Sequence, residues 1–361
     1  MKHEHDDYQL LHEFYKSACS KLTAGSWDYL RGAAETETTF KRNRAAIEAI
    51  AFRPRVLRDV EDVDASATLV GQPLRIPVIT SPIGSLQDFD PDAGAAVARA
   101  CTRFGTMNMQ SLVSEPGLEA TAAASDGPKL FQLYVRGDES WVDDHARRAI
   151  DAGYKGFCVT VDLDYYAKRE RDIAKRYVTT ARKTSFSNEH HQKRFNWSDV
   201  ERLKNNFDVP LMIKGIATAE DARLCVEHGV DVVFVSNHGG RQLDQGRGCL
   251  DVLPEVVDAV RGKAEVMIDG GFLRGTDVVK AMALGANAVG MGRMYGFALA
   301  ADGEDGVVRM LEILEQEIIS CLGLLGVKSF AELDASYLYP NAPLMAPAGY
   351  DSVFPLMKEG Y

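Results

Sequence analysis

The chain has 361 residues, of which 46% are hydrophobic and 26% charged, and its formal net charge is −11. These values are typical of a globular protein with a large core, and the negative charge argues against a broad nucleic-acid-binding surface. No apolar run is long enough to cross a bilayer, and the opening residues do not form a signal peptide. We therefore expect neither a membrane nor a nucleic acid as a partner.

Six cysteines are scattered along the chain, and no two of them form a C-x-x-C pair. Most lie in apolar segments, as Cys158 does in GFCVTV. This usage favours reduced core residues over a disulfide framework or a zinc site. We expect a cytoplasmic protein without a bound metal.

From the N-terminus, residues 1–74 are predicted to form a helical extension. From about residue 75, short apolar runs rich in β-branched residues alternate with amphipathic helical stretches. The eight runs are IPVITSP (76–82), TMNMQS (106–111), KLFQLYV (129–135), GFCVTVD (156–162), VPLMIKG (209–215), VVFVSN (232–237), AEVMIDG (264–270) and AVGMGR (288–293). Thr218 and Gly229 bracket one helical stretch as start and stop signals. A closing amphipathic helix follows over residues 303–326.

Eight strands that alternate with helices predict an α/β fold, a TIM (β/α)8 barrel over about residues 75–325 with an irregular tail over residues 326–361. The competing fold, a doubly wound sheet, would place a G-x-G-x-x-G turn after its first strand. No such turn follows the run at residues 76–82. We expect the whole chain, residues 1–361, to be a single domain.

Nearly every predicted strand ends in a polar side chain or a glycine, and in a barrel these ends form the active face. The residues are Pro82, Gly84, Gln110, Ser111, Gln132, Tyr134, Thr160, Asp162, Lys214, Ser236, His238, Asp269, Gly270, Gly271, Gly292 and Arg293. Any one of them could be a buried group satisfied by the backbone, but together they converge on one pocket.

The last two predicted strands also carry glycine turns, whose backbone N–H groups and the nearby Arg293 suit a phosphate. Lys214, at the end of the fifth strand, would point into the same mouth. A lysine there suits either a Schiff base or an anionic cofactor ring, and both remain open from the residues alone.

The stretch SNHGGRQLD, residues 236–244, is the most specific motif of the chain. Together with FQLYV, TVD…KRERD, IKG and DGG…RGTDVVKAMALGA…GMGR, it resembles the FMN-dependent 2-hydroxy acid oxidase and dehydrogenase family. The resemblance covers residues from about 27 to 325, in order and at compatible spacing. It implies the same barrel, FMN as cofactor and the oxidation of an L-2-hydroxy acid to the 2-oxo acid.

The resemblance also implies roles for single residues. His238 looks like the catalytic base and Asp162 like the carboxylate that orients it. Arg169 and Arg241 look like the clamp on the substrate carboxylate. The other substrate contacts implied are Tyr29, Tyr134 and Tyr166. The residues implied to bind FMN are Pro82, Ile83, Gly84, Ser111, Gln132, Thr160, Lys214, Ser236, Asp269, Gly270, Gly271, Arg274, Gly292 and Arg293.

Three positions depart from the family pattern. Leu273, in DGGFLRG, stands where relatives carry an arginine that helps to hold the phosphate, and we expect Arg274 or Arg293 to compensate. Tyr166 replaces a small or aliphatic residue and would narrow the pocket or stack on an aromatic substrate. Gly84 stands where many oxidases have alanine, which leaves dehydrogenase and monooxygenase chemistry open beside oxidase chemistry.

The leading prediction is an FMN-dependent enzyme for a small-molecule 2-hydroxy acid, with O2 or another electron acceptor. The resemblance suggests a homotetramer or homo-octamer, and the polar loop at residues 173–196 is predicted to act as a lid. One alternative is a relative diverted to a larger natural-product- or peptide-linked substrate, or a monooxygenase-type variant. Another is a catalytically silent flavin-binding barrel, which would not need the complete set of implied catalytic residues.

Overall fold

The centre of the molecule is a closed barrel of eight parallel strands in the spatial order β10-β11-β4-β5-β6-β7-β8-β9. The structure is a computed structural model that describes residues 8–184, 189–342, 350, 353, 354 and 357. The barrel strands are β4 (Val78–Thr80), β5 (Asn108–Ser111), β6 (Lys129–Leu133), β7 (Phe157–Thr160), β8 (Leu211–Ile216), β9 (Val232–Val235), β10 (Glu265–Ile268) and β11 (Ala288–Met291). Each coincides with one of the eight apolar runs, so the predicted TIM barrel is confirmed.

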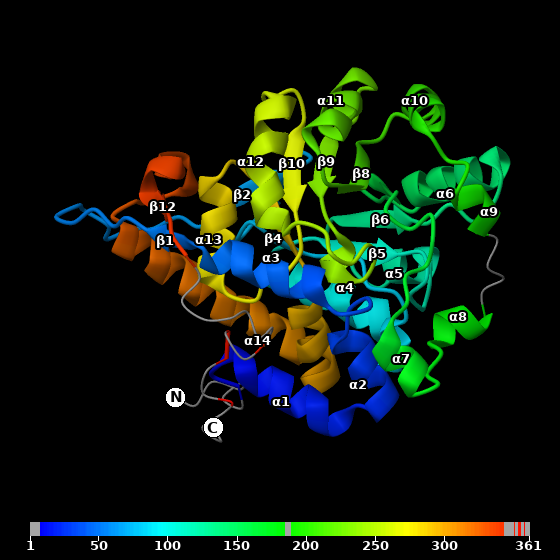
Figure 1. Cartoon of the computed structure of the whole chain (residues 1–361), viewed down its shortest axis with the longest axis horizontal. Helices are drawn as coiled ribbons and strands as arrows, with labels where there is room; N and C mark the ends of the chain where they lie inside the picture. The colour runs from blue at the N-terminus through cyan, green and yellow to red at the C-terminus, as the bar shows by residue number, and fades with distance from the viewer. Residues whose placement is uncertain (1–7, 185–188, 343–349, 351–352, 355–356, 358–361) are drawn as a thin grey trace.

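Helices surround the barrel strands (Figure 1). They are α4 (Ala93–Phe104), α5 (Leu118–Ala123), α6 (Glu139–Asp151), α7 (Glu170–Ala174), α8 (Thr180–Thr184), α9 (Glu189–Gln192), α10 (Trp197–Asn206), α11 (Ala219–Glu227), α12 (Cys249–Val260), α13 (Gly275–Ala283) and α14 (Arg293–Leu325). The start signal of α11 is confirmed, because the Thr218 hydroxyl accepts a hydrogen bond from the backbone N–H of Asp221. Non-helical backbone at Asp302 and Gly303 interrupts α14, and the segment after this kink is the predicted closing helix.

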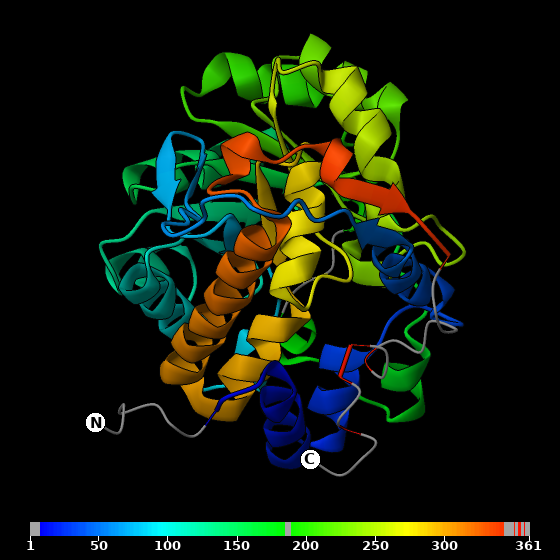
Figure 2. The same cartoon turned by 90° about the vertical axis from the view of Figure 1, so that its left-hand side faces the viewer.

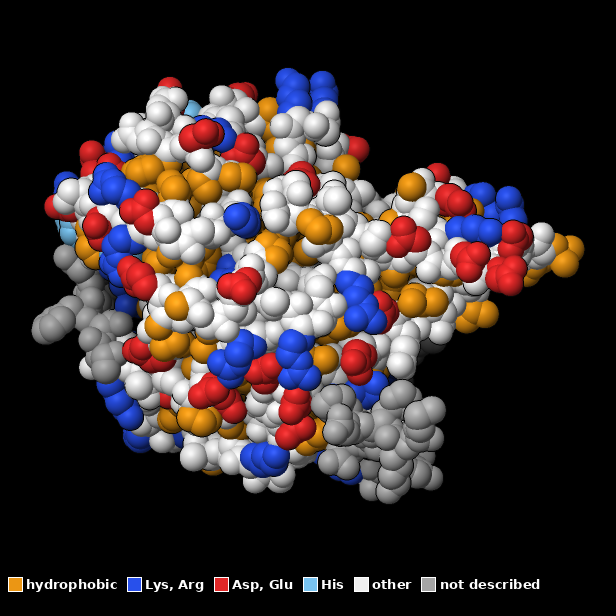
Figure 3. Space-filling model, turned by 180° about the vertical axis from the view of Figure 1, so that it is seen from behind, with side chains coloured by type: hydrophobic (Ala, Val, Ile, Leu, Met, Phe, Trp, Pro, Cys, Tyr) orange, Lys and Arg blue, Asp and Glu red, His pale blue; other side chains and the backbone are white. Residues whose placement is uncertain are grey.

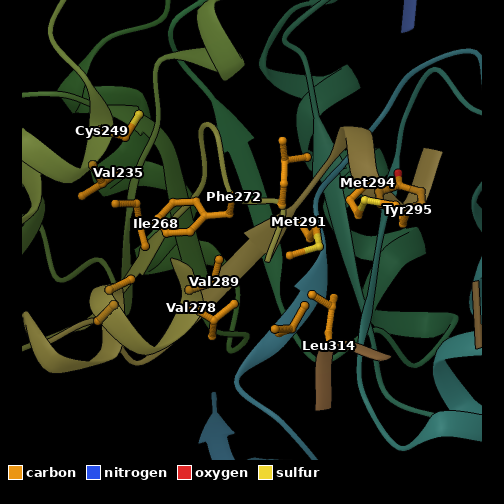
Figure 4. Packing of buried hydrophobic residues seen from close by; sticks show 14 of the residues in the cluster. Val235, Cys249, Ile268, Phe272, Val278, Val289, Met291, Met294, Tyr295 and Leu314 are labelled. Atoms are coloured by element: carbon orange, nitrogen blue, oxygen red, sulfur yellow. The ribbon is translucent and has the colours of Figure 1, made fainter. Parts of the chain in front are cut away.

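Two hydrophobic cores follow from the alternation of side chains along the strands. One fills the barrel interior and includes Val232 and Phe234 of β9. The other lies between strands and helices and includes Val233 and Val235 of the same strand. Figure 4 shows part of this second core, where Val235 and Ile268 lie near Cys249 of α12. Since both faces of each strand are buried, the strands appear in the sequence as continuous apolar runs.

The N-terminal extension contains α1 (Leu11–Lys21), α2 (Ala24–Arg31) and α3 (Thr38–Glu48), and α1 packs along α14 (Figure 2). The extension is not only helical, because it also holds β1 (Ile50–Phe52), β2 (Ala67–Leu69) and β3 (Gln72–Leu74). The β2–β3 hairpin contributes Leu69 and Leu74 to the interior core, so it closes the amino end of the barrel.

The tail was predicted to be irregular, and this is wrong for β12 (Leu338–Pro340), which pairs antiparallel with β1. Short strands of this kind carry little periodicity, and their pairing depends on a partner far away in the sequence. The pairing fastens the tail to the extension.

No helix within the described residues is long and apolar enough to cross a membrane. On the face shown in Figure 3, basic and acidic side chains are interspersed. Five of the six cysteines are buried and unpaired, as expected, whereas Cys19 is exposed on α1.

Candidate active site

A cavity of about 1180 Å³, including its open mouth, lies at the carboxyl ends of the barrel strands. The predicted site residues that line it are Tyr29, Pro82, Ile83, Gly84, Tyr134, Tyr166, Arg169, Lys214, His238, Arg241, Asp269, Gly270, Gly271, Gly292 and Arg293. They come from the extension, the ends of seven barrel strands and the loops that follow them. The chain therefore brings together side chains up to 264 positions apart, from Tyr29 to Arg293.

His238 forms the centre of the site through contacts on both ring nitrogens. Its Nδ1 lies 2.9 Å from Asp162 Oδ1, and its Nε2 lies 3.4 Å from the Tyr134 hydroxyl. Because a carboxylate accepts the Nδ1 proton, Nε2 is left as the acceptor atom that faces the cavity. Burial lowers the pKa of His238 below its ordinary value, against the raising effect of Asp162, so the ring is neutral at pH 7. A neutral imidazole with an oriented Nε2 can take up a proton.

The turn that presents His238 has left-handed backbone at three consecutive residues. The φ angles of His238, Gly239 and Gly240 are 58°, 63° and 77°. A Cβ atom on Gly240 would also lie 2.6 Å from the backbone nitrogen of Phe40 in α3, so a glycine is required there. A non-glycine residue in this conformation is strained, and such strain concentrates at functional sites.

A pair of amides fastens this turn to α3. Asn43 and Asn237 donate to each other's side-chain oxygen, at 3.0 and 2.8 Å. Asn237 Oδ1 also accepts from the backbone N–H of Gly240. The sequence motif contained Asn237, but no local pattern marked Asn43, which lies 194 positions away.

Arg169 and Arg241 lie together beside Tyr29. Arg169 Nε contacts the Arg241 carbonyl at 3.4 Å, and the Arg241 guanidinium lies 4.7 Å from the centre of the Tyr29 ring. Arg241 uses Nη1 on the carbonyls of Tyr29 and Gly32, whereas its buried Nη2 has no partner among the described residues. Burial, and then the charge of Arg169, lower the pKa of Arg241 to about 10. Two adjacent guanidinium groups with an unused donor form a site for an anion.

Lys214 holds a fixed positive charge at the base of the cavity. Its Nζ donates to Ser236 Oγ at 2.7 Å and lies 3.3 Å from Asp269 Oδ2. Burial would lower the pKa of Lys214, but Asp269 and Asp162 outweigh it and raise the pKa above its ordinary value. The raised pKa and the contact with Asp269 favour the ammonium form of Lys214. This form supports the interpretation that Lys214 faces an anionic cofactor ring over the interpretation that it forms a Schiff base.

Comparison with known proteins agrees with this geometry. The family described as FMN-dependent dehydrogenase matches residues 18–340. Glycolate oxidase 1 of Oryza sativa subsp. indica is 37% identical and covers 92% of this chain and 96% of its own. A peroxisomal (S)-2-hydroxy-acid oxidase of Oryza sativa subsp. japonica is 38% identical, with coverage of 90% and 94%. The crystal structure of mandelate oxidase with benzoylformic acid has a TM-score of 0.87 and 36% identity, and covers 94% of this chain and 100% of its own.

The chain belongs to the FMN-dependent dehydrogenase family. It is therefore an enzyme that uses FMN. The cavity fits this cofactor, because Arg293 Nε at its glycine-rich end is buried without a partner among the described residues. A Cβ atom on Gly292 would meet no atom within 4 Å, so space for a ligand lies beside that backbone.

At the end of the cavity predicted to hold the FMN phosphate, Leu273 stands in place of the arginine of the family pattern. Of the two arginines expected to compensate for it, only Arg293 lines this cavity. Leu273 is buried and lines the cavity. The prediction that Arg274 binds the cofactor is wrong in this structure, because its guanidinium pairs with Glu317 at 2.6 Å and lines a separate cavity. Arg274 is the N-cap residue that directly precedes α13, and Glu317 of α14 holds its side chain. Arg293 remains, with its Nη atoms on the carbonyls of Gly239 and Gly32.

Three predicted flavin-contacting residues form a hydrogen-bonded row across adjacent strands. Ser111 Oγ donates to Gln132 Oε1 at 2.8 Å, and Gln132 Nε2 donates to Thr160 Oγ1 at 2.9 Å. All three are buried, and they are not among the residues that line the cavity. Asp162 and Ser236 likewise lie behind His238 and Lys214. Direct contact of these residues with FMN stays a prediction.

Residues of the loop after β7 line the cavity, and α7, α8 and α9 lie in the described part of this loop. That the loop acts as a lid stays a prediction. Asp88 anchors it, because Tyr177 donates to this carboxylate at 2.7 Å and the Thr180 hydroxyl donates to it as well. Residues 185–188 of the predicted lid lie outside the described residues.

Several lining residues escaped the sequence interpretation, namely Phe40, Val113, Arg136, Arg182 and Tyr350. Arg136 directly follows FQLYV, so its place beyond a strand end was the one sequence signal that could have marked it as a cavity residue.

Among the described residues, no cluster of three or more His, Cys, Asp or Glu side chains could hold a metal ion.

Proposed function

We propose that the enzyme oxidises an L-2-hydroxy acid to the 2-oxo acid, with His238 as the base. The observation that carries this proposal is the contact of His238 Nδ1 with Asp162, which leaves Nε2, beside the Tyr134 hydroxyl, as the unprotonated ring nitrogen in the cavity that Arg169 and Arg241 also line. A hydroxy acid needs one group for its carboxylate and one for its proton, and these residues supply both.

In the proposed mechanism, Arg169 and Arg241 bind the substrate carboxylate and so fix the orientation of the hydroxyl-bearing carbon. His238 Nε2 accepts a proton from the substrate, and Asp162 stabilises the resulting imidazolium. Bound FMN supplies the acceptor for the two electrons. The Lys214 ammonium stabilises the negative charge that develops during the reaction. Burial raises the pKa of both Tyr29 and Tyr134, so their phenols stay protonated and can donate hydrogen bonds to the substrate.

The test is to replace His238 by alanine in the FMN-loaded enzyme and to mix it anaerobically with a panel of L-2-hydroxy acids. We expect the wild type to bleach its flavin absorbance, and His238→Ala to retain FMN but to reduce it at least about 100-fold more slowly, as the loss of a general base predicts. Unchanged reduction in the variant contradicts the mechanism. Admission of air then shows whether O2 or another electron acceptor reoxidises the flavin. Bleaching by none of the acids would favour the larger, natural-product- or peptide-linked substrate.

We also propose that residues 1–361 work as one domain, because Tyr29 of the extension and Tyr350 of the tail line the same cavity as the barrel residues. We propose as well that the enzyme forms a homotetramer or homo-octamer.

Exposed apolar side chains, such as Val56 and Leu57, support this self-association. Light scattering measures this state. The unpaired cysteines support a cytoplasmic location, which fractionation of the producing cells tests.

A further inference from the structure

The cavity carries far more positive than negative side chains. Among the described residues that line it, the charged ones are Arg136, Arg169, Arg182, Lys214, Arg241, Arg293 and Asp269. In the proposed function, Lys214 and Arg293 serve FMN, and Arg169 and Arg241 serve one substrate carboxylate. Arg136 and Arg182 have no part in that scheme, and we call them the second arginine pair.

Arg136 is a half-buried cation with no anionic partner among the described residues. It lies just beyond β6, two residues after Tyr134, and no carboxylate of the described residues forms an ion pair with it. Burial lowers its pKa, and only the phenols of Tyr134 and Tyr166 act in the opposite direction. Keeping a guanidinium partly out of water without a counter-charge is unfavourable, so a ligand anion would relieve this cost.

Arg182 lines the same cavity from α8. Its guanidinium is 4.2 Å from the centre of the Tyr166 ring. Arg169 lies 4.3 Å from the centre of that ring, so the Tyr166 ring contacts both Arg182 and one arginine of the carboxylate clamp. Arg182 forms no ion pair with any carboxylate of the described residues, although Asp88 fixes the start of its helix. Both arginines of the pair therefore line the cavity, and neither guanidinium has a hydrogen-bond partner among the described residues.

We propose that Arg136 and Arg182 bind a second anionic group of the substrate, so that the enzyme acts on 2-hydroxy acids with a negative charge at the far end. This proposal rests on the proposed function and specifies its substrate class. The shared chemistry is an anion with several acceptor oxygens, either a second carboxylate or a phosphate, because the guanidinium fork matches both. Tyr166 would pack against the carbon chain between the two charged ends.

The test compares matched substrates in anaerobic flavin reduction by the FMN-loaded, full-length enzyme. (S)-2-Hydroxyglutarate is paired with (S)-2-hydroxypentanoate, and (S)-malate with (S)-2-hydroxybutanoate, so that only the terminal charge differs. A 3-phosphorylated 2-hydroxypropanoate distinguishes phosphate from carboxylate. For each acid, the limiting reduction rate is divided by the apparent Kd. We expect the wild type to prefer the acid with the second anionic group by about 10-fold or more, as charge-assisted hydrogen bonds predict.

Variants then assign that preference to the second arginine pair. Arg136→Gln and Arg182→Gln should each lower the ratio of dicarboxylate to monocarboxylate by about 10-fold or more, and Arg136→Lys should restore part of it. The matched control is Lys183→Gln, which removes an equal charge from the next residue of α8, outside the residues that line the cavity. Calorimetric titration with glutarate and pentanoate, neither of which has the hydroxyl group, provides a readout that does not depend on turnover.

The outcomes separate the two proposals. A wild-type enzyme that reduces its flavin with monocarboxylates but shows no preference for a second anionic group overturns this inference and leaves the proposed function standing. Arginine variants that slow both members of each substrate pair equally also overturn it, because a packing role would act in that way. If none of the acids reduces the flavin, the proposed function fails and this inference fails with it. A preference for the phosphorylated acid supports the inference with phosphate as the anion.

Discussion

At the scale of single residues, burial and neighbouring charges shift the pKa values of the site residues in opposite directions. His238 is neutral because its burial outweighs Asp162, whereas Lys214 is charged because Asp269 and Asp162 outweigh its burial. Burial raises the pKa of Asp162, but His238 and Lys214 bring it below its ordinary value. An unprotonated base and a fixed cation thus lie in one cavity, because burial prevails at His238 and the neighbouring carboxylates prevail at Lys214.

The pH dependence of flavin reduction follows from these shifts. Protonation of His238 removes the base, so the reduction rate divided by the substrate Kd should fall in acid, with a midpoint below the ordinary histidine value of 6.5. It should form a plateau from neutral pH upwards. The measurement is anaerobic stopped-flow from about pH 5 to 9.

The control for this profile is Asp162→Asn. Asp162 raises the pKa of His238, so its loss should move the acid limb to lower pH. It should also lower the plateau by roughly 100-fold, because the imidazolium loses its carboxylate. An acid limb centred above pH 7, or one that does not respond to Asp162→Asn, would contradict the assignment of the base.

At the scale of elements, the loops after neighbouring strands fit against each other closely. Gly84, after β4, lies against Val113, after β5, so that a Cβ atom on Gly84 would be 2.6 Å from Val113 Cγ2. The Gly84 carbonyl also accepts the hydroxyl of Tyr29 at 3.2 Å. The glycine that departs from the family pattern is therefore matched to its neighbour, and no alanine fits without movement.

Gly84→Ala should slow anaerobic flavin reduction by about 10-fold, since overpacking of this kind costs about 1–3 kcal/mol and displaces Tyr29. Gly84→Ala combined with Val113→Ala should recover most of the rate, because the smaller side chain makes room. Val113→Ala alone serves as the control. Equal rates for the single Gly84→Ala variant and the double variant would show that the contact with Val113 is not the reason for the glycine.

At the scale of the whole molecule, the two ends of the chain complete the cavity. Tyr350 of the tail is buried, donates to the Arg31 carbonyl 319 positions away, and packs against Tyr15, Phe40 and Phe297. It also lines the cavity. The barrel alone would therefore leave one wall of its own active site open.

Tyr350→Ala should lower the free energy of unfolding by about 3 kcal/mol, as expected for the loss of a buried aromatic side chain. It should also accelerate the release of FMN, because the cavity wall loses a ring. Thermal melts and FMN fluorescence on dilution measure these effects. Tyr350→Phe should change stability by only about 1 kcal/mol, the value of one hydrogen bond. Tyr339→Ala, at an exposed position of β12, is the second control. Equal melting temperatures and FMN release for Tyr350→Ala and Tyr339→Ala would contradict this account.

The sequence by itself determined the barrel and the chemistry at its rim. Strand runs are local patterns, and parallel strands in a barrel must end on the same face, so the residues after each run could be assigned to one pocket without coordinates. His238, Asp162 and Lys214 were found in this way, whereas the role of Arg241 was implied by the family resemblance. Their common position follows from strand direction alone.

Only the tertiary structure decided the contacts between distant segments. No local pattern predicts that Asn43 pairs with Asn237, that β12 pairs with β1, or that Tyr350 closes the cavity. The direction of Arg274, away from the cavity, and the unpaired state of Arg136 among the described residues likewise depend on what packs around each side chain. Periodicity encodes which face of an element is buried, whereas the identity of the partner on that face is set by the packing of the whole chain.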